Sequence, residues 1–253
     1  MANTPNGNNH TFLLALSDAL RAQTGVEAVG NRATQLIARQ LGVDRVYLVS
    51  LNPDNDIVTV THETRRSDMP PLQGSYRSSD FPAAIRELFE RTILYTDVRT
   101  DARLTELDRL SFAGLGAVGF MAASLRRGSG TTIWAAGAIS TQPREWTASD
   151  VVLFEYALER TWAAIERERV EQALLASELK YRSLFESIDQ GYCLVEVIIN
   201  EAGKPVDLLH VEVNQAYERQ TGLSDIVGKR ALDISPVGEE WLDFYGNVAL
   251  TGQ

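Results

Sequence analysis

The chain has 253 residues, of which 44% are hydrophobic and 23% are charged, an ordinary composition for a globular protein. This composition excludes a collagen-like chain and one that is coiled coil throughout. At about 150 residues per domain, the length fits one large domain or two small ones. The 24 Lys and Arg and 34 Asp and Glu residues give a net charge of −10. Because an acidic surface repels phosphate backbones, we expect no nucleic-acid partner.

The single cysteine, Cys193, excludes an intrachain disulfide and a zinc site built from cysteines. Residues 1–10 are polar, without the basic segment and apolar core of a signal peptide, so they are predicted to be a disordered tail. No run of 18 apolar residues occurs, so no membrane-spanning helix is expected. These features predict a cytoplasmic protein of a reducing compartment, with no membrane partner.

The first part of the chain reads as helices followed by a hairpin. Apolar residues recur at helical spacing over residues 11–23 and 26–40, and Gly42 is placed to end the second helix. Residues 45–51 and 57–62 are rich in β-branched and apolar residues and are joined by a turn-rich segment, which predicts a β-hairpin.

Shorter elements follow, and their order indicates an antiparallel sheet with flanking helices, an α+β fold. The spacing predicts a polar loop, then helices and strands in alternation, and last a hairpin whose loop is Arg126 to Gly130. The ranges are a loop over 65–80, helices over 82–91 and 104–115, and strands over 93–98, 118–125 and 132–140.

The longest helical signal covers residues 147–188, a stretch that contains no Pro or Gly. Thr147 is placed as an N-cap, Asp150 completes a capping box, and Trp146 and Val151 fit a hydrophobic staple across it. About 42 residues at 1.5 Å each give a helix of roughly 60 Å, longer than a compact domain needs.

A narrow apolar stripe along this segment is typical of paired helices. We therefore predict one continuous helix that forms a homodimer through Leu158, Trp162 and Ile165, with Val170, Leu174 and Leu175 further along the stripe. Two helices with a break near Ser177 are the alternative.

After Gly191 the pattern returns to strands, over residues 192–199 and 206–213. Asn214 is placed to cap a helix that Gly222 ends, and a last helical stretch covers residues 239–250. This second block has α+β character and ends early.

Residues 11–165 resemble a GAF domain. The segments that carry the likeness are residues 42–51, Ser79-Asp-Phe-Pro82, residues 96–104 and residues 142–147. The resemblance implies a GAF-like antiparallel sheet and a ligand pocket between the sheet and residues 65–115.

Residues 178–253 resemble the start of a PAS domain, on residues 181–191 and 213–222. A complete PAS sheet has further strands, so the resemblance implies an incomplete PAS domain and a chain that is a piece of a longer protein. GAF–PAS pairs imply the input region of a sensor histidine kinase or, alternatively, of a diguanylate cyclase. An interaction adaptor that binds no small molecule is a further alternative.

Motif position and strand alternation select the candidates for the GAF pocket. Polar and aromatic side chains are chosen because they would fix the orientation of a ligand. The candidates are Tyr47, His62, Tyr76, Asp80, Phe81, Phe120, Trp134 and Ser140.

The segment Ser79-Asp-Phe-Pro82 resembles the Asp-Ile-Pro motif of phytochromes, but covalent attachment of a bilin needs a thiol, and residues 11–165 contain no cysteine. Ser140 occupies the strand position at which phytochromes often carry a stacking histidine. The cyclic-nucleotide signature of other GAF domains is absent. We therefore expect no cofactor, and expect Asp80 to cap the helix that begins at Pro82.

His62 precedes Glu63 and Arg65, a superficial likeness to the phospho-acceptor box of a histidine kinase. That box requires a helix, whereas His62 lies in a predicted strand, where it would share a face with Val58 and Val60 and be half-buried or line the pocket. The three histidines have no metal-ligand spacing, so no metal site is expected.

Cys193 lies outside the helical motif of flavin-binding PAS domains, so it is expected to be a small buried residue. Some GAF proteins are free methionine sulfoxide reductases, but these use several cysteines, and the GAF-like residues 11–165 contain none. No catalytic residue is predicted.

Overall fold

The computed structural model describes residues 7–72, 74–125, 133–234 and 238–252. The chain forms two compact units, Met1–Gln172 and Ala173–Gln253, which are described separately below.

A six-stranded antiparallel sheet is the centre of the first unit, in the order β3-β2-β1-β6-β5-β4. The predicted hairpin of β1 and β2 and the antiparallel pairing of β5 with β6 are confirmed. The predicted hairpin loop between β5 and β6 lies outside the described residues. The strands are β1 Arg45–Asn52, β2 Ile57–Arg65, β3 Ser75–Arg77, β4 Ile93–Tyr95, β5 Gly119–Leu125 and β6 Ile133–Ser140.

Strand β3 corrects the prediction of an uninterrupted loop over residues 65–80. Its three residues pair with the beginning of β2. So short a segment has too few residues to show a strand period, and its pairing with β2 defines it as a strand.

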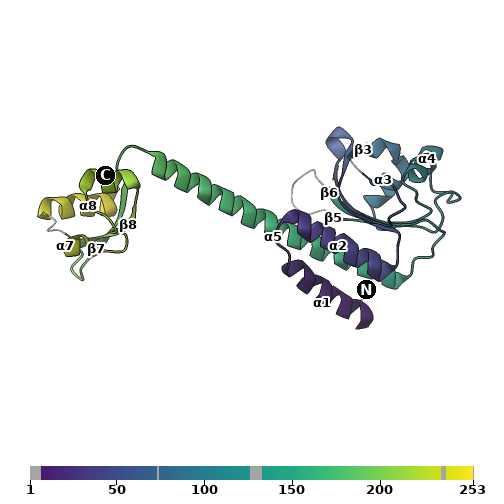
Figure 1. Cartoon of the computed structure of the whole chain (residues 1–253), viewed down its shortest axis with the longest axis horizontal. Coiled ribbons are helices and arrows are strands. Elements are labelled where there is room, and N and C mark those ends of the chain that lie inside the picture. Colours follow the sequence, from purple (N-terminus) through teal and green to yellow (C-terminus); the bar gives the residue numbers. More distant parts are fainter. Residues whose placement is uncertain (1–6, 73, 126–132, 235–237, 253) are drawn as a thin grey trace. The chain divides into compact units, whose positions relative to one another are not determined.

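Helices cover both faces of this sheet (Figure 1). Helices α1 Gly7–Arg21 and α2 Val26–Leu41 pack with the first half of α5 Ala148–Ser187 on one face, where Val46 and Leu48 of β1 point. Helices α3 Pro82–Leu88 and α4 Glu106–Gly114 lie on the opposite face. The short 3-10 helices η1 Pro53–Asn55 and η2 Ser78–Asp80 precede β2 and α3.

Helix α1 begins at Gly7, so the prediction that the disordered tail extends through residue 10 is wrong for residues 7–10. The side chain of Asn9 is buried, and its amide donates hydrogen bonds to the carbonyl and hydroxyl of Ser149 at 2.9 and 3.0 Å. This contact with a residue far along the chain holds the first turn in place. Residues 1–6 lie outside the described residues.

Helix α5 Ala148–Ser187 is a single continuous helix of 40 residues, and the alternative break near Ser177 is absent from it. Its start follows the predicted capping box. The Thr147 amide donates to Asp150 Oδ2 at 3.0 Å, and the Asp150 amide donates to Thr147 Oγ1 at 3.1 Å.

The structure does not support the predicted dimer seam on the first half of α5. Leu158 and Ile165 are only 3% and 1% exposed, because both pack into the core between α5, α1, α2 and the sheet. Trp162 is partly buried. Side chains already enclosed by their own unit cannot pack into a second chain.

The second unit contains a β-hairpin and short helices after the end of α5. Strands β7 Cys193–Ile199 and β8 Pro205–Val213 pair antiparallel. Asn214 caps α6 Gln215–Thr221 as predicted, accepting from the Tyr217 amide at 2.9 Å, and Gly222 ends it with a φ of 72°. Helix α7 Ala231–Ile234 was not predicted, whereas α8 Glu239–Thr251 matches the last predicted helix.

The α+β class is thus confirmed: an antiparallel sheet with flanking helices, a long helix, and a small hairpin with helices. None of the helices within the described residues combines the length and apolar character that crossing a bilayer requires.

Candidate functional site

A cavity of about 70 Å³ lies between the sheet of the first unit and the segments that cover its second face. Its walls are contributed by all six strands, by α3 and α4, and by the loops between them. The lining residues are Tyr47, Val49, Leu51, Val58, Val60, Leu72, Tyr76, Phe81, Ala84, Ile85, Leu88, Ile93, Phe112, Leu115, Phe120, Ala122, Ala135, Ala136 and Gly137.

Strand alternation brings Tyr47, Val49 and Leu51 of β1 to the cavity. Tyr47 needs a glycine beside it, because a Cβ on Gly137 of the paired strand would lie 2.3 Å from the phenol ring. Burial raises the pKa of Tyr47, so its hydroxyl stays protonated at neutral pH.

A buried ion pair stabilises the segments at one side of the cavity. Arg45 is fully buried, and its Nε lies 2.9 Å from Glu63 Oε1. The same guanidinium donates to the carbonyls of Leu115, at 3.0 Å, and Pro70, while Glu63 Oε2 accepts from the Leu72 amide at 3.1 Å. Both charges are therefore engaged with the chain, and they fix the two segments that bring Leu72 and Leu115 to the cavity.

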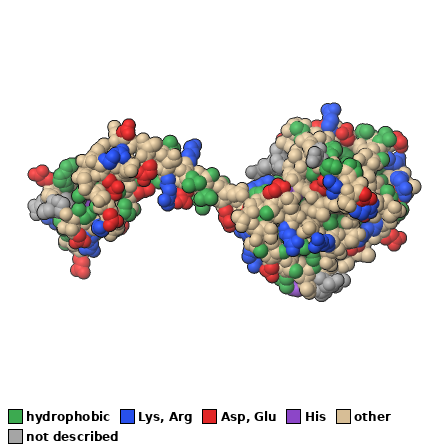
Figure 2. Space-filling view, viewed as in Figure 1, with side chains coloured by type: hydrophobic (Ala, Val, Ile, Leu, Met, Phe, Trp, Pro, Cys, Tyr) green, Lys and Arg blue, Asp and Glu red, His purple; other side chains and the backbone are tan. Residues whose placement is uncertain are grey.

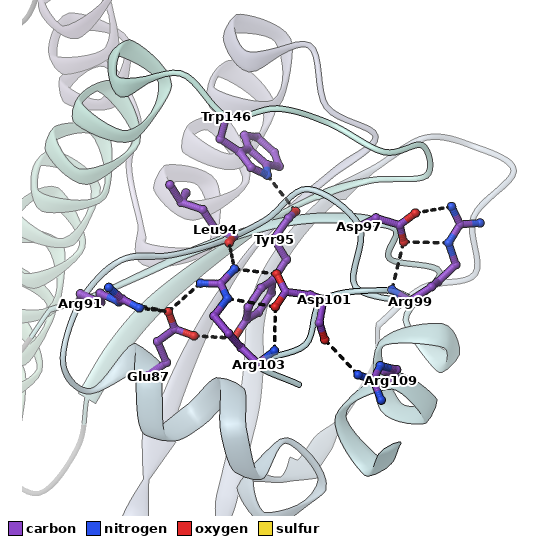
Figure 3. Close-up of polar contacts among 10 residues, drawn as sticks. All are labelled: Glu87, Arg91, Leu94, Tyr95, Asp97, Arg99, Asp101, Arg103, Arg109 and Trp146. Atoms are coloured by element: carbon purple, nitrogen blue, oxygen red, sulfur yellow. Dashed lines mark hydrogen bonds and ion pairs between the residues drawn. The ribbon is translucent and has the colours of Figure 1, made fainter. Parts of the chain in front are cut away.

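The segment 96–104, which carries part of the GAF resemblance, forms two matching turns (Figure 3). Asp97 accepts from the side chain of Arg99 at 2.6 Å, and Asp101 accepts from that of Arg103 at 2.7 Å. Each aspartate also accepts from the backbone amide of its arginine. The repeated Asp-x-Arg spacing thus stabilises two local turns.

Arg103 and Tyr95 connect this segment to α3 through Glu87 (Figure 3). Arg103 Nη1 and the Tyr95 hydroxyl each donate to Glu87 at 2.9 Å, and burial together with Glu87 raises the pKa of Tyr95. The Tyr95 ring stacks near Phe120, with centroids 6.3 Å apart. The network therefore supports the aromatic wall of the cavity.

Asp108, and not Asp80, accepts the hydrogen bonds of the free backbone amides at the N-terminus of α3. The expectation that Asp80 caps this helix is wrong, since no side-chain cap bond is found there. Instead the fully buried carboxylate of Asp108 accepts from the amides of Ala83 and Ala84, at 3.1 to 3.3 Å. It also caps its own helix by accepting from the amide and hydroxyl of Thr105. One carboxylate thereby joins α3 to α4.

Four of the eight predicted pocket residues line the cavity: Tyr47, Tyr76, Phe81 and Phe120. Asp80, at the end of η2, is not among the lining residues.

His62 lies on the opposite face of the sheet from the cavity because of a β-bulge. Leu48 pairs with His62 but Val49 pairs with Val60, so Thr61 is an extra residue in β2. The bulge reverses the alternation, and His62 packs against Gly30 of α2 while Val60 faces the cavity.

Trp134 and Ser140 also lie on the face covered by α1, α2 and α5, since the alternate residues Ile133, Ala135 and Ile139 belong to the hydrophobic cluster on the cavity face. The guanidinium of Arg169 stacks over the Trp134 ring at 4.5 Å, a contact between β6 and α5. The Ser140 hydroxyl donates to the Gln142 carbonyl at 2.8 Å.

The sequence reasoning missed most of the apolar lining, in particular Phe112 and Leu115 of the α4 region. Helical periodicity could have placed Phe112 on the buried face of α4, but not beside Phe120, whose ring centroid lies 4.7 Å from that of Phe112.

The second unit has its own cavity, of about 370 Å³, between the hairpin and the short helices. Cys193 lines it and is partly buried; burial raises the pKa of its thiol, which is hydrogen-bonded to the Tyr217 side chain. Across the described ranges of the chain, no three His, Cys, Asp or Glu side chains converge as metal ligands would.

No family model and no curated protein matches this sequence. The structure, however, resembles solved GAF domains. A phycoerythrobilin-bound GAF domain from a cyanobacterial phytochrome is 16% identical, with 68% of this chain and 100% of that chain covered and a TM-score of 0.55. The bacteriophytochrome RpBphP3 from the photosynthetic bacterium R. palustris is 18% identical, with 74% and 44% covered and a TM-score of 0.56. The biliverdin-bound JSC1_58120g3 is 14% identical, with 62% and 99% covered and a TM-score of 0.54.

These likenesses establish the fold of the first unit: its six-stranded antiparallel sheet with flanking helices is GAF-like, as the sequence resemblance implied. At identities of this level they carry no information about what this chain binds.

Proposed function

We propose that this chain is a sensory and dimerisation module, the cytoplasmic input region of a signal-transduction protein, with a two-component histidine kinase as the favoured output. Two observations together carry the proposal. The GAF-like first unit contains a cavity, and its last element is a helix of 40 residues that continues into the second unit. A rigid helix can pass a change in the first unit onward, provided that it has two alternative arrangements.

The proposed homodimer uses the later part of the predicted stripe, from Val170 onward, and leaves out Leu158, Trp162 and Ile165. Val170, Leu174, Ser177, Tyr181 and Leu184 follow one another at alternating spacings of four and three residues, the period of a coiled-coil seam. Leu174 and Leu184 are 69% and 57% exposed. Figure 2 shows hydrophobic side chains among charged ones along the exposed part of α5. A second copy presents the same stripe, so the two helices are self-complementary.

Leu179 provides a matched control, because it is 59% exposed on the same helix but lies off this seam. In light scattering, the wild-type chain should have twice its mass of 28.0 kDa. Leu174→Glu combined with Leu184→Glu should give the monomer mass, whereas Leu179→Glu should remain a dimer, since only the first two leucines enter the seam.

A monomeric wild-type chain would contradict the dimer. Equal disruption by Leu179→Glu would contradict the seam. The cavity favours sensing over the alternative of an adaptor that binds no small molecule, and a diguanylate cyclase is the second candidate for the output. That the second unit is the beginning of a PAS domain is part of the same proposal.

A further inference from the structure

We propose that the cavity of the first unit binds a compact, uncharged ligand that is mostly hydrocarbon and carries at most one hydrogen-bonding group. This inference rests on the proposed sensory function and narrows it to a class of ligand. It sets this chain apart from a GAF domain that holds a tetrapyrrole or a cyclic nucleotide.

The first argument is charge. Every lining side chain is uncharged. The charged side chains near the cavity already have partners. Arg45 pairs with Glu63 and donates to two carbonyls, and Asp108 accepts from backbone amides at the starts of two helices. A carboxylate or phosphate in the cavity would lose its hydration and gain no counter-charge in return. Anionic ligands are therefore disfavoured.

The second argument is volume. The cavity measures about 70 Å³, roughly half of the ~150 Å³ of an apolar cavity that accommodates benzene. Sites that enclose drug-sized ligands measure about 300–1,000 Å³. The largest ligand that we expect to fit is therefore the size of a single ring. Tyr76, Phe81 and Ile85 are only partly buried, so they form the wall that can move outward to admit it. A linear tetrapyrrole is excluded on both grounds: its several rings exceed the volume of the cavity, and its ionised propionates would find no counter-charge there.

The third argument is the character of the wall. Phe81, Phe112 and Phe120 present ring edges and faces, with centroids 5.2 Å apart for the first pair and 4.7 Å for the second. The hydroxyls of Tyr47 and Tyr76 are the only polar side-chain groups in the lining. Aromatic walls with one polar end suit a ring or short branched chain that offers a single polar group.

The test uses the full chain with four probes: phenol, toluene, benzoate and cyclic GMP. Binding is measured by saturation-transfer NMR and titration at pH 7, where phenol and toluene are uncharged and the other two are anions. We expect phenol and toluene to bind, and benzoate and cyclic GMP to bind at least about tenfold more weakly because their charges are desolvated.

Variants locate the bound probe. Ala84→Leu and, from a different wall, Ala122→Val fill the cavity and should each weaken phenol binding by about tenfold or more. Ala113→Leu places the same larger side chain on the exposed surface of α4 and should leave binding unchanged. Tyr47→Phe should weaken phenol by about two- to tenfold and leave toluene unaffected, because it removes one hydrogen bond.

Tight binding of benzoate or cyclic GMP, or phenol binding that survives both filling variants, would overturn the proposal, and so would the absence of phenol and toluene binding. If Ala84→Leu does not fold, Ala122→Val decides the location. Binding is detected directly, so this inference can fail while the α5 homodimer stands, and the homodimer can fail while phenol still binds.

Discussion

Two aspartates near the start of α3 show how differently similar residues are used. Asp80 precedes the helix by two positions and was the expected cap, yet the carboxylate that binds the first free amides of α3 belongs to Asp108, which comes from the next helix along the chain. Asp108 also closes a capping box with Thr105. Its burial and its contacts with both helices make it a structural residue.

Replacing Asp108 should therefore be costly, and replacing Asp80 should not. We expect Asp108→Ala to lower the free energy of unfolding by about 2–3 kcal/mol, since it leaves buried amides at two helix starts without an acceptor. Asp80→Ala, the control, should change it by less than about 0.5 kcal/mol. Urea unfolding monitored by circular dichroism measures both, and equal costs for the two variants would refute the assignment of the cap to Asp108.

At the scale of elements, the bulge in β2 decides which side chains face the cavity and which face the helices. Because Thr61 is the extra residue, His62 lies against α2, with its Nε2 3.6 Å from Glu27 Oε2, and Arg169 of α5 is close enough to repel a proton on it. Burial, the larger effect, lowers the pKa of His62 from its ordinary 6.5, and Glu27 opposes this only in part.

This packing predicts a pH dependence of stability. Below about pH 6.5 the unfolded chain protonates His62 more readily than the folded chain does, so the free energy of unfolding should fall as the pH falls through this value. We expect the fall between pH 7.5 and 5.5 to be smaller in His62→Gln than in the wild type. His10→Gln, which changes an exposed histidine, should behave as the wild type. Parallel pH profiles for all three chains would refute the role of His62.

At the scale of the whole molecule, the two large hydrophobic clusters both belong to the first unit, one on each face of its sheet. The second unit has a two-stranded sheet and many exposed apolar side chains. Since burial of apolar area is the main source of stability, the first unit holds most of the stability of the chain.

Residues 1–172 expressed alone should consequently fold, unfold in a single cooperative transition, and bind phenol as the full chain does. They should also be monomeric, because they lack Leu174, Tyr181 and Leu184 of the proposed seam. Circular dichroism and light scattering test these expectations. A dimer of residues 1–172 would move the interface to the first unit, and an unfolded fragment would show that the second unit is required for stability.

The sequence by itself determined the features that depend on neighbours along the chain. The period of β1, the helix end at Gly42, the capping box of Thr147 and the continuity of α5 all follow from residues within a few positions of one another. The four predicted pocket residues that line the cavity lie in or beside elements whose alternation or motif could be read in this way.

Only the tertiary structure decided the features that join distant segments. The bulge that turns His62 away from the cavity depends on the register between β1 and β2, and the role of Asp108 depends on the approach of α4 to α3. Leu158 and Ile165 have the spacing of a helix seam, but α1, α2 and the sheet bury them first. The physical reason is the same each time: an apolar or polar side chain is satisfied by whichever partner the fold brings to it, and spacing along one element cannot name that partner.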